Sequence, residues 1–299
     1  MNRIRHVLAA VDRFPQNDPV LARAAEIARA HQARLTIVHV VGRFAGFDPA
    51  PADPGMIQHQ IRLIARENIE AAMARQAIDM PGVDIRIESG SPSLRLVDLA
   101  HETRADLVVM MAHQGDSILA KIIGSTTDRV IRAACAPVLV VKRPVMQAYE
   151  RVVVAVDPSD ESGAIVTFVA ALFPLARLRL VHAVQISPQF EEAMRRAGHG
   201  QASLAAHRDA LVRQAKARLR DLSEQLAHRP ARSSTWVAVG DPAQLLARAT
   251  RNPQGSLIVL GPGSPDLIRR ALLGSVTRRV LQTAACDVLI CPAAVIHRV

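Results

Sequence analysis

Two stretches of the chain match one another closely: IIGSTTDRVIRAACAPVLVV at residues 122–141 and LLGSVTRRVLQTAACDVLIC at residues 272–291. Each has Gly-Ser at its third and fourth positions, a pair suited to the beginning of a helix, and each ends in an apolar run suited to a buried strand. A motif of this length that occurs twice in one chain indicates a duplicated unit. The sequence therefore predicts two copies of one domain.

Further pairs of segments repeat in the same order on the N-terminal side of these stretches. They are IRHVLAAVD (4–12) and YERVVVAVD (149–157), LTIVHVV (35–41) and LRLVHAV (178–184), SGSPSLRLVDLA (89–100) and VGDPAQLLARA (239–249), and DLVVMM (106–111) and SLIVLG (256–261). Short apolar runs alternate with helical patterns in each copy, which predicts α/β domains with parallel sheets and right-handed crossovers. We place the domains at residues 1–144 and 150–299, joined by a linker from Pro144 to Glu150.

Composition agrees with two domains, because 299 residues amount to roughly 150 for each. Hydrophobic residues make up 49% and aromatic residues only 3%, so the cores must be built from Ala, Val, Leu and Ile. No apolar run reaches the roughly 18 residues of a membrane span. Three cysteines without a Cys-x-x-Cys pair, and an N-terminus unlike a signal peptide, favour the cytosol.

The formal net charge of +10 favours anionic partners such as nucleotides, nucleic acid or acidic headgroups. The arginines are scattered over both copies, however, and a solvated coat on helix faces is the simpler interpretation. With one Trp, one Tyr and six Phe, the chain has too few aromatic side chains for a nucleic-acid stacking platform.

The second copy carries a glycine-rich turn followed by a helix start. Gly261-Pro262-Gly263-Ser264 follows an apolar strand, and nine residues later comes Gly274-Ser275-Val276-Thr277. Glycine lets the backbone approach a phosphate, and Ser275 can cap the helix, whose N-terminus attracts anions. Arg269 and Arg270 between them can add charge-assisted bonds. A tight turn without a ligand produces the same pattern.

An acidic residue, Asp157, ends the first strand of the same copy. Such an acid can bind a ribose hydroxyl or the adenine edge, although Pro158-Ser159 behind it also suits a turn or helix cap. Strands one and four should be neighbours, so both features should face one gap at the carboxyl edge of the sheet.

These motifs, with Asp at the end of strand one and Gly-x-x-Ser before Gly-Ser, resemble the ATP-binding universal stress proteins, and the resemblance covers nearly the whole chain twice. The tandem arrangement and the segment MMAHQGDS (110–117) are similar to the E-type members. The resemblance implies two tandem Rossmann-like domains of the adenine nucleotide alpha hydrolase type, each a five-stranded parallel sheet sandwiched by helices. It also implies a stress-response protein that holds ATP, alone or with Mg²⁺, with little or no turnover.

The family's site carries over best to the second copy. The end of strand one and the backbone after His182 would hold adenosine, and the glycine turn and helix start would hold phosphates. Ser264 stands where a glycine is usual, and Gly263 can supply the flexibility instead. The implied nucleotide-binding residues are Ala155, Val156, Asp157, Ala183, Gly261, Gly263, Ser264, Gly274, Ser275, Val276 and Thr277.

The first copy departs further from the pattern. Asp12 and Gly124 are present, but Met111 and Gln114 occupy the glycine positions and Gly115 breaks the spacing. We therefore expect this copy to be mainly a scaffold and one nucleotide to bind per chain.

Three functions remain open: an ATP-binding stress protein without dedicated catalysis, a slow ATPase, or a nucleotide-free scaffold or binder of another acidic ligand such as RNA. No catalytic or metal-binding constellation emerges from the spacing, and His39 and His182 suit buried structural roles. We expect the copies to pack as a pseudo-dimer through their last strands, with a further homodimer open, and the stretches Gly42–Gly55 and Gln185–Ser203 to be irregular.

Overall fold

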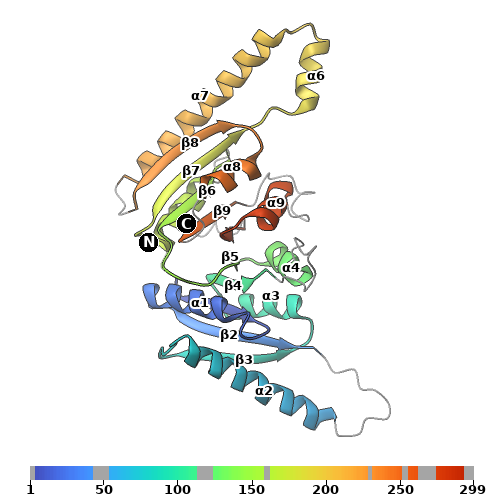
Figure 1. Cartoon of the computed structure of the whole chain (residues 1–299), viewed down its shortest axis with the longest axis vertical. Coiled ribbons are helices and arrows are strands. Elements are labelled where there is room, and N and C mark those ends of the chain that lie inside the picture. The colour runs from blue at the N-terminus through green and yellow to red at the C-terminus, as the bar shows by residue number, and fades with distance from the viewer. Residues whose placement is uncertain are drawn as a thin grey trace.

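The computed structural model describes residues 4–42, 54–112, 124–157, 162–227, 231–250, 255–261 and 274–292. Its ten strands form one continuous sheet in the order β3-β2-β1-β4-β5-β10-β9-β6-β7-β8 (Figure 1). Strands β1 to β5 and their helices make up the first half, and β6 to β10 with theirs make up the second half. The predicted α/β class with two tandem parallel sheets is confirmed, and the two sheets merge into one.

The first half alternates strand and helix throughout, as the repeat predicts. The strands are β1 (His6–Val11), β2 (Arg34–Val41), β3 (Val83–Ser89), β4 (Leu107–Met111) and β5 (Val138–Val141). The helices are α1 (Asp18–His31), α2 (Pro54–Arg75), α3 (Pro92–Glu102) and α4 (Ser125–Ala133).

The second half repeats this order with one additional helix. The strands are β6 (Arg151–Ala155), β7 (Arg177–Val184), β8 (Ser233–Val239), β9 (Ser256–Leu260) and β10 (Asp287–Ile290). The helices are α5 (Ser162–Leu172), α6 (Pro188–Arg196), α7 (Gln201–Gln225), α8 (Pro242–Ala249) and α9 (Ser275–Thr283).

The additional helix α6 shows that the expected irregular stretch Gln185–Ser203 is wrong. The Ser187 side chain caps this helix by accepting a 3.1 Å hydrogen bond from the backbone N–H of Phe190, and Pro188 occupies the first turn. Glu191 adds an acidic residue near the helix N-terminus, where negative charge is favourable. Most of the counterpart stretch, Gly42–Gly55, lies outside the described residues.

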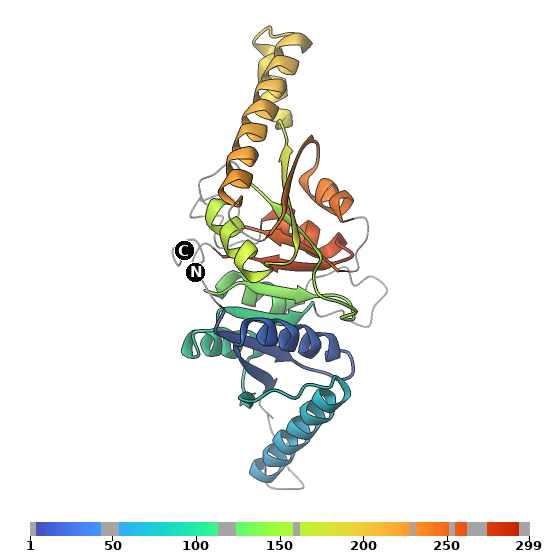
Figure 2. The same cartoon turned by 90° about the vertical axis from the view of Figure 1, so that its left-hand side faces the viewer.

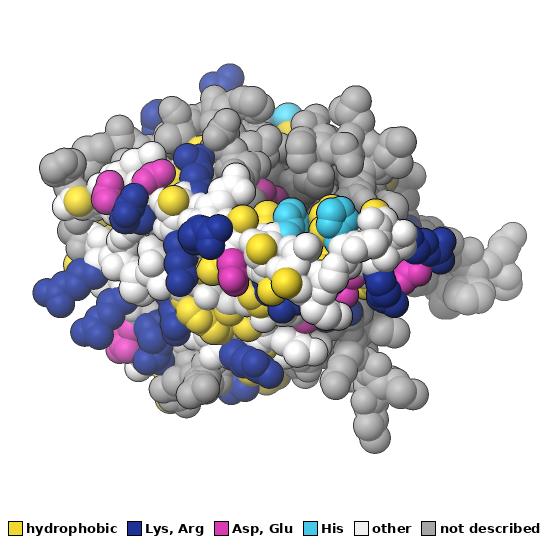
Figure 3. All heavy atoms as spheres, turned by 90° about the horizontal axis from the view of Figure 1, so that it is seen from above, with side chains coloured by type: hydrophobic (Ala, Val, Ile, Leu, Met, Phe, Trp, Pro, Cys, Tyr) yellow, Lys and Arg dark blue, Asp and Glu magenta, His cyan; other side chains and the backbone are white. Residues whose placement is uncertain are grey.

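Long helices project from both ends of the molecule, α2 at one end and α7 with α6 at the other (Figure 2). Lys and Arg side chains are spread over the α7 end and interspersed with acidic ones (Figure 3). Several belong to ion pairs within one helix, such as Arg196 with Glu192 and Arg220 with Glu224. Among the described helices, none is both long enough and apolar enough to cross a membrane.

Within each half the strands run parallel, and the first strand lies in the middle. β1 pairs with β2 on one side and with β4 on the other, and β6 lies in the same way between β7 and β9. The predicted neighbours, strands one and four, are therefore confirmed in both halves. This arrangement creates the gap between loops at which open α/β sheets bind ligands.

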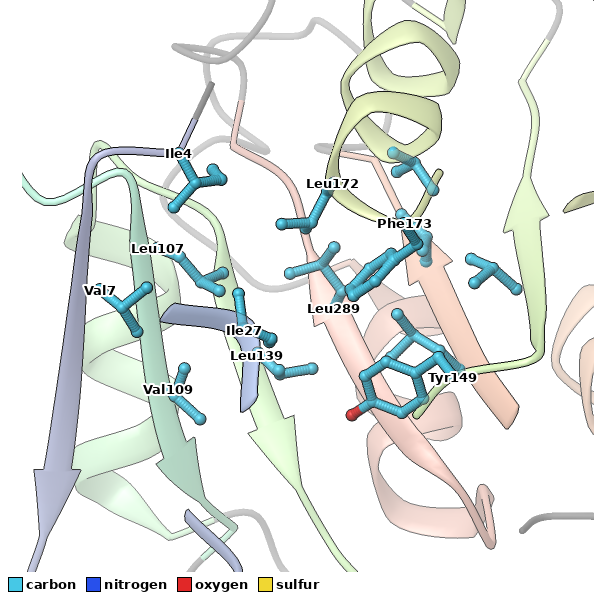
Figure 4. Close-up of a cluster of buried hydrophobic side chains, with 14 of the residues drawn as sticks. Ile4, Val7, Ile27, Leu107, Val109, Leu139, Tyr149, Leu172, Phe173 and Leu289 are labelled. Atoms are coloured by element: carbon cyan, nitrogen blue, oxygen red, sulfur yellow. The ribbon is translucent and has the colours of Figure 1, made fainter. Parts of the chain in front are cut away.

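The two halves meet along a seam where β5 and β10 pair antiparallel. Leu139 lies opposite Leu289, and both side chains are fully buried. Leu172 and Ile27 come from helices of the two halves and pack near this pair (Figure 4). The pairing confirms the predicted contact through the last strands, since each strand would otherwise leave an apolar edge exposed.

A buried polar cluster lies at one end of this seam. The Tyr149 hydroxyl donates a 2.5 Å hydrogen bond to Asp287, and the Arg23 guanidinium lies 3.8 Å from the centre of the Tyr149 ring. Burial raises the pKa of Tyr149 well above its ordinary value, so the phenol stays protonated and donates. The segment expected to be a plain linker thus carries a buried anchor, Tyr149, between the halves.

Candidate functional site

The predicted nucleotide-binding residues of the second half that the structure describes gather at one carboxyl edge of the sheet. β6 ends at Ala155, and β9, its neighbour, ends next to Gly261. On the other side of β6, Ala155 lies opposite Val181 of β7, so the same register continued by two residues brings Asp157 beside Ala183. Chain segments far apart in the sequence therefore converge above β6.

Asp157 has a fixed backbone and an exposed side chain. Its N–H donates to the Ser162 hydroxyl oxygen at 3.2 Å, and that hydroxyl donates to the Asp157 carbonyl oxygen at 2.7 Å. Ser162, the first residue of α5, thereby holds the end of strand one in place. The residue is exposed and its backbone is anchored, as a ligand-binding acid requires.

A histidine of the second strand supports the end of the first strand in both halves. His182 Nδ1 lies 2.7 Å from the Val156 carbonyl oxygen, and His39 Nδ1 lies 3.0 Å from that of Val11. Both rings are half-buried rather than fully buried, and the bond gives each a structural role. In the second half, this hydrogen bond orders the backbone directly before Asp157, beyond the end of β6, and next to Ala183 on β7.

Gly261 has a packing role that the sequence does not reveal. A Cβ atom at this position would lie 2.9 Å from Cδ1 of Ile165, a buried residue of α5. The absence of a side chain lets α5 pack closely over the end of β9. The glycine therefore serves the fold whether or not a ligand binds.

The start of α9 presents helix N–H groups to this edge. Gly274 is the N-cap, with no hydrogen bond from a side chain, so the predicted capping by Ser275 is wrong and Ser275 is the first helical residue. Because the first N–H groups of a helix have no partner within it, those of Ser275, Val276 and Thr277 form the positive end of the helix. Among the described residues, a Cβ at Gly274 would meet only the Thr277 hydroxyl, at 3.9 Å.

Other predicted contributors to this site lie outside the described residues. They are Gly263, Ser264, Arg269 and Arg270. One further cation of α9, Arg279, forms an ion pair with Asp241, the N-cap residue of α8. The pKa of Asp241 is lowered, chiefly by the backbone N–H of Gln244 and also by Arg279.

The equivalent edge of the first half contains a cavity of about 1010 Å³. This volume lies near the upper end of the roughly 300–1,000 Å³ that small-molecule sites occupy. Asp12, Gly124 and Ser125 line it at positions that match Asp157, Gly274 and Ser275. Met111 is part of its wall and does not fill it, while Gln114 and Gly115 lie outside the described residues. The first half therefore contains a ligand-sized space, although we expected it to be mainly a scaffold.

Three cations on the wall of this cavity were missed by sequence reasoning: Arg13, Lys142 and Arg143. Lys142 and Arg143 follow β5 directly, so they lie at the carboxyl edge of the sheet. Lys142 Nζ also donates a 2.7 Å hydrogen bond to the Ala284 carbonyl oxygen, and Arg143 donates to that of Ala285. Two of the three cations of the first-half cavity, Lys142 and Arg143, are therefore hydrogen-bonded to the second half.

Comparison with known proteins agrees with this architecture. The family model described as the universal stress protein family matches residues 3–142 and again residues 148–292. Universal stress protein A homolog 1 of Coxiella burnetii is 30% identical over 145 residues, which cover 46% of this chain and 95% of that protein.

Two solved structures resemble the whole chain in fold. A protein of unknown function from Pseudomonas aeruginosa PAO1 has a TM-score of 0.65 at 18% identity, covering 99% of this chain and 95% of its own. A universal stress protein from Archaeoglobus fulgidus DSM 4304 has a TM-score of 0.64 at 14% identity, covering 96% of each chain. With the family model matched once in each half, the chain belongs to the universal stress protein family and carries two tandem copies of its domain.

Proposed function

We propose that the second half binds ATP at the carboxyl edge above β6 and that the protein acts in stress responses as a nucleotide-binding protein without dedicated catalysis. The observation that supports this most directly is the convergence of Asp157, Ala183 and the uncapped start of α9 on one edge. An exposed carboxylate suits ribose hydroxyls, and a helix N-terminus suits phosphates.

The residues present fit such a ligand. The Asp157 backbone is anchored by Ser162, so the carboxylate needs little reorganisation on binding. The Gly274 Cα has room around it, and Ser275 is exposed beside the free end of the helix. These residues would position the nucleotide; Mg²⁺, if it accompanies ATP, would neutralise phosphate charge.

A second candidate function, an additional anionic-ligand site in the first half, is favoured by the 1010 Å³ cavity and its three cations. An anion there would compete with the carbonyl oxygens of Ala284 and Ala285 for Lys142 and Arg143. The surface at the α7 end gives less support to RNA binding, because its cations are interspersed with acids.

Calorimetric titration of the purified full-length chain with ATP, with and without Mg²⁺, tests the proposal. We expect saturable binding with one nucleotide per chain and no phosphate release above the spontaneous rate. Two equivalent sites would assign nucleotide to the first-half cavity as well. The absence of binding in the folded protein would leave the scaffold interpretation.

A further inference from the structure

A thiol and an imidazole face each other on the surface of the first half, away from the candidate nucleotide site. His101 Nε2 lies 3.1 Å from Sγ of Cys135. His101 belongs to the last turn of α3 and is exposed, while Cys135 follows α4 and is partly exposed. The two side chains thus come from different elements and meet where solvent has access.

The packing of α3 against α4 holds this pair in place. Ala134 and Ala136, which flank Cys135, are 6% and 3% exposed, and Ala100, which precedes His101, is 7% exposed. All three belong to one buried cluster on this face of the sheet. Because the core fixes the backbone on both sides, the thiol and the imidazole extend towards each other from ordered positions.

The other two cysteines have the opposite surroundings. Cys286 and Cys291 are 1% and 0% exposed, and burial raises the pKa of their thiols to about 11 and about 12. A thiol reacts as its thiolate, so burial makes both of them inert near neutral pH. At the position that matches Cys135, the second half has Ala285.

We infer that Cys135 is an oxidant-sensitive modification site, with His101 as the base that accepts its proton. The co-reactant is a peroxide. Sγ attacks one oxygen of hydrogen peroxide, the O–O bond breaks and an S–O bond forms. The thiol proton passes to Nε2, which must be unprotonated, and then to the departing hydroxide, which leaves as water. Sulfur loses two electrons, the peroxide gains them, and the product is a sulfenic acid.

This chemistry is independent of nucleotide binding and can be tested directly on the full chain. The folded protein is treated with hydrogen peroxide near neutral pH, sulfenic acid is trapped with dimedone, and the labelled peptides are identified by mass spectrometry. We expect the adduct on Cys135 and not on Cys286 or Cys291. After unfolding in denaturant, all three cysteines should react with an alkylating agent.

His101→Gln is the decisive variant, because glutamine keeps a polar group near Nε2 but cannot accept the proton. We expect the rate of Cys135 oxidation to fall at least tenfold, towards the roughly hundredfold loss at the lower end of general-base effects. His199→Gln, at another exposed histidine, should leave the rate unchanged. In His101→Ala, added imidazole should restore part of the rate, which a merely structural histidine would not allow. An unchanged rate in His101→Gln, or equal labelling of the buried cysteines in the folded protein, would overturn the inference.

Discussion

Lys142, on the wall of the first-half cavity, donates a 2.7 Å hydrogen bond from Nζ to the carbonyl oxygen of Ala284, the C-cap residue of α9 in the second half. The same helix begins at the candidate phosphate-binding turn. The Lys142 side chain therefore lines the first-half cavity and also contacts the end of α9, the helix whose start would hold phosphates in the second half.

Burial lowers the pKa of Lys142 from its ordinary 10.5, which predicts a pH-dependent effect of the substitution Lys142→Met. Between the lowered folded pKa and 10.5 the unfolded chain binds more protons, so this lysine adds stability to the folded state as pH rises. The free energy of unfolding of the wild type should thus rise relative to that of the variant as the pH increases from neutral to 10.5. Urea unfolding of both proteins across this range measures the difference, and a difference that shrinks or stays constant would contradict it.

The buried thiol of Cys291 predicts a loss of stability in alkali. Burial raises its pKa from 9.0 to about 12, so the folded state retains a proton that the unfolded state releases. Its contribution is complete below pH 9.0 and is lost as pH rises towards 12, at about 1.4 kcal/mol per pH unit. Cys291→Ala should show a smaller decline between pH 9 and pH 11 in urea unfolding. Cys135→Ala, which leaves the buried thiols in place, should decline like the wild type.

The seam predicts that the two halves unfold together. Leu139→Ala removes a fully buried side chain opposite Leu289 and should cost about 2–5 kcal/mol. Trp236, the only tryptophan, lies in β8 of the second half. Its fluorescence should nevertheless report the lower midpoint of this first-half variant.

The matched control for this experiment is Leu94→Ala, because Leu94 is 67% exposed on α3. That variant should unfold at nearly the wild-type midpoint. A Trp236 transition that does not move in Leu139→Ala would show instead that the second half unfolds independently.

Two substitutions test the candidate nucleotide site of the second half. Gly274→Val should fold, because among the described residues a Cβ there meets only one atom, at 3.9 Å. It should abolish ATP binding by filling the turn that would face the phosphates. Asp157→Ala should weaken binding by about 1–3 kcal/mol, the scale of a hydrogen bond to a charged group. Calorimetry measures the affinities, and Trp236 fluorescence checks folding. Unchanged affinity in folded Gly274→Val would place the site elsewhere.

Asp241 predicts a local effect at α8. Its side chain accepts a 3.0 Å hydrogen bond from the Gln244 N–H, so Asp241→Ala should cost about 0.5–2 kcal/mol, as lost helix caps do. Asp241→Asn retains an acceptor oxygen and should lose less than the alanine variant. Thermal unfolding of the two variants beside the wild type distinguishes the lost cap from the lost ion pair with Arg279.

The repeat predicts strand order and pairing well, because both follow from local patterns. An apolar run such as Val152–Val154 is buried on both faces, and the last strands must cover each other's edges. The helix α6 was missed although its signal, Ser187-Pro188 followed by Glu191, is local. We expected an irregular segment because the stretch Gln185–Ser203 is long, although its cap residues indicate a helix.

The electrostatic features of the site could not be predicted in this way. Lys142 and Arg143 stand directly after a strand, and nothing in the linear order shows that they border a cavity or contact Ala284. The packing of Gly261 against Ile165 is equally non-local. Of the residues implied by family resemblance, those of β6, β7 and the start of α9 do share one edge, and their ligand stays a prediction.

The covalent joining of the halves gives them a freedom that two separate identical subunits lack. In a homodimer every substitution appears twice, so a lysine after the last strand would face its own copy across the seam. In this chain Lys142 follows β5, whereas the matching residue after Cys291 is Pro292. The fusion has broken the equivalence of the two sides, and each half is able to specialise its edge of the sheet without altering the other.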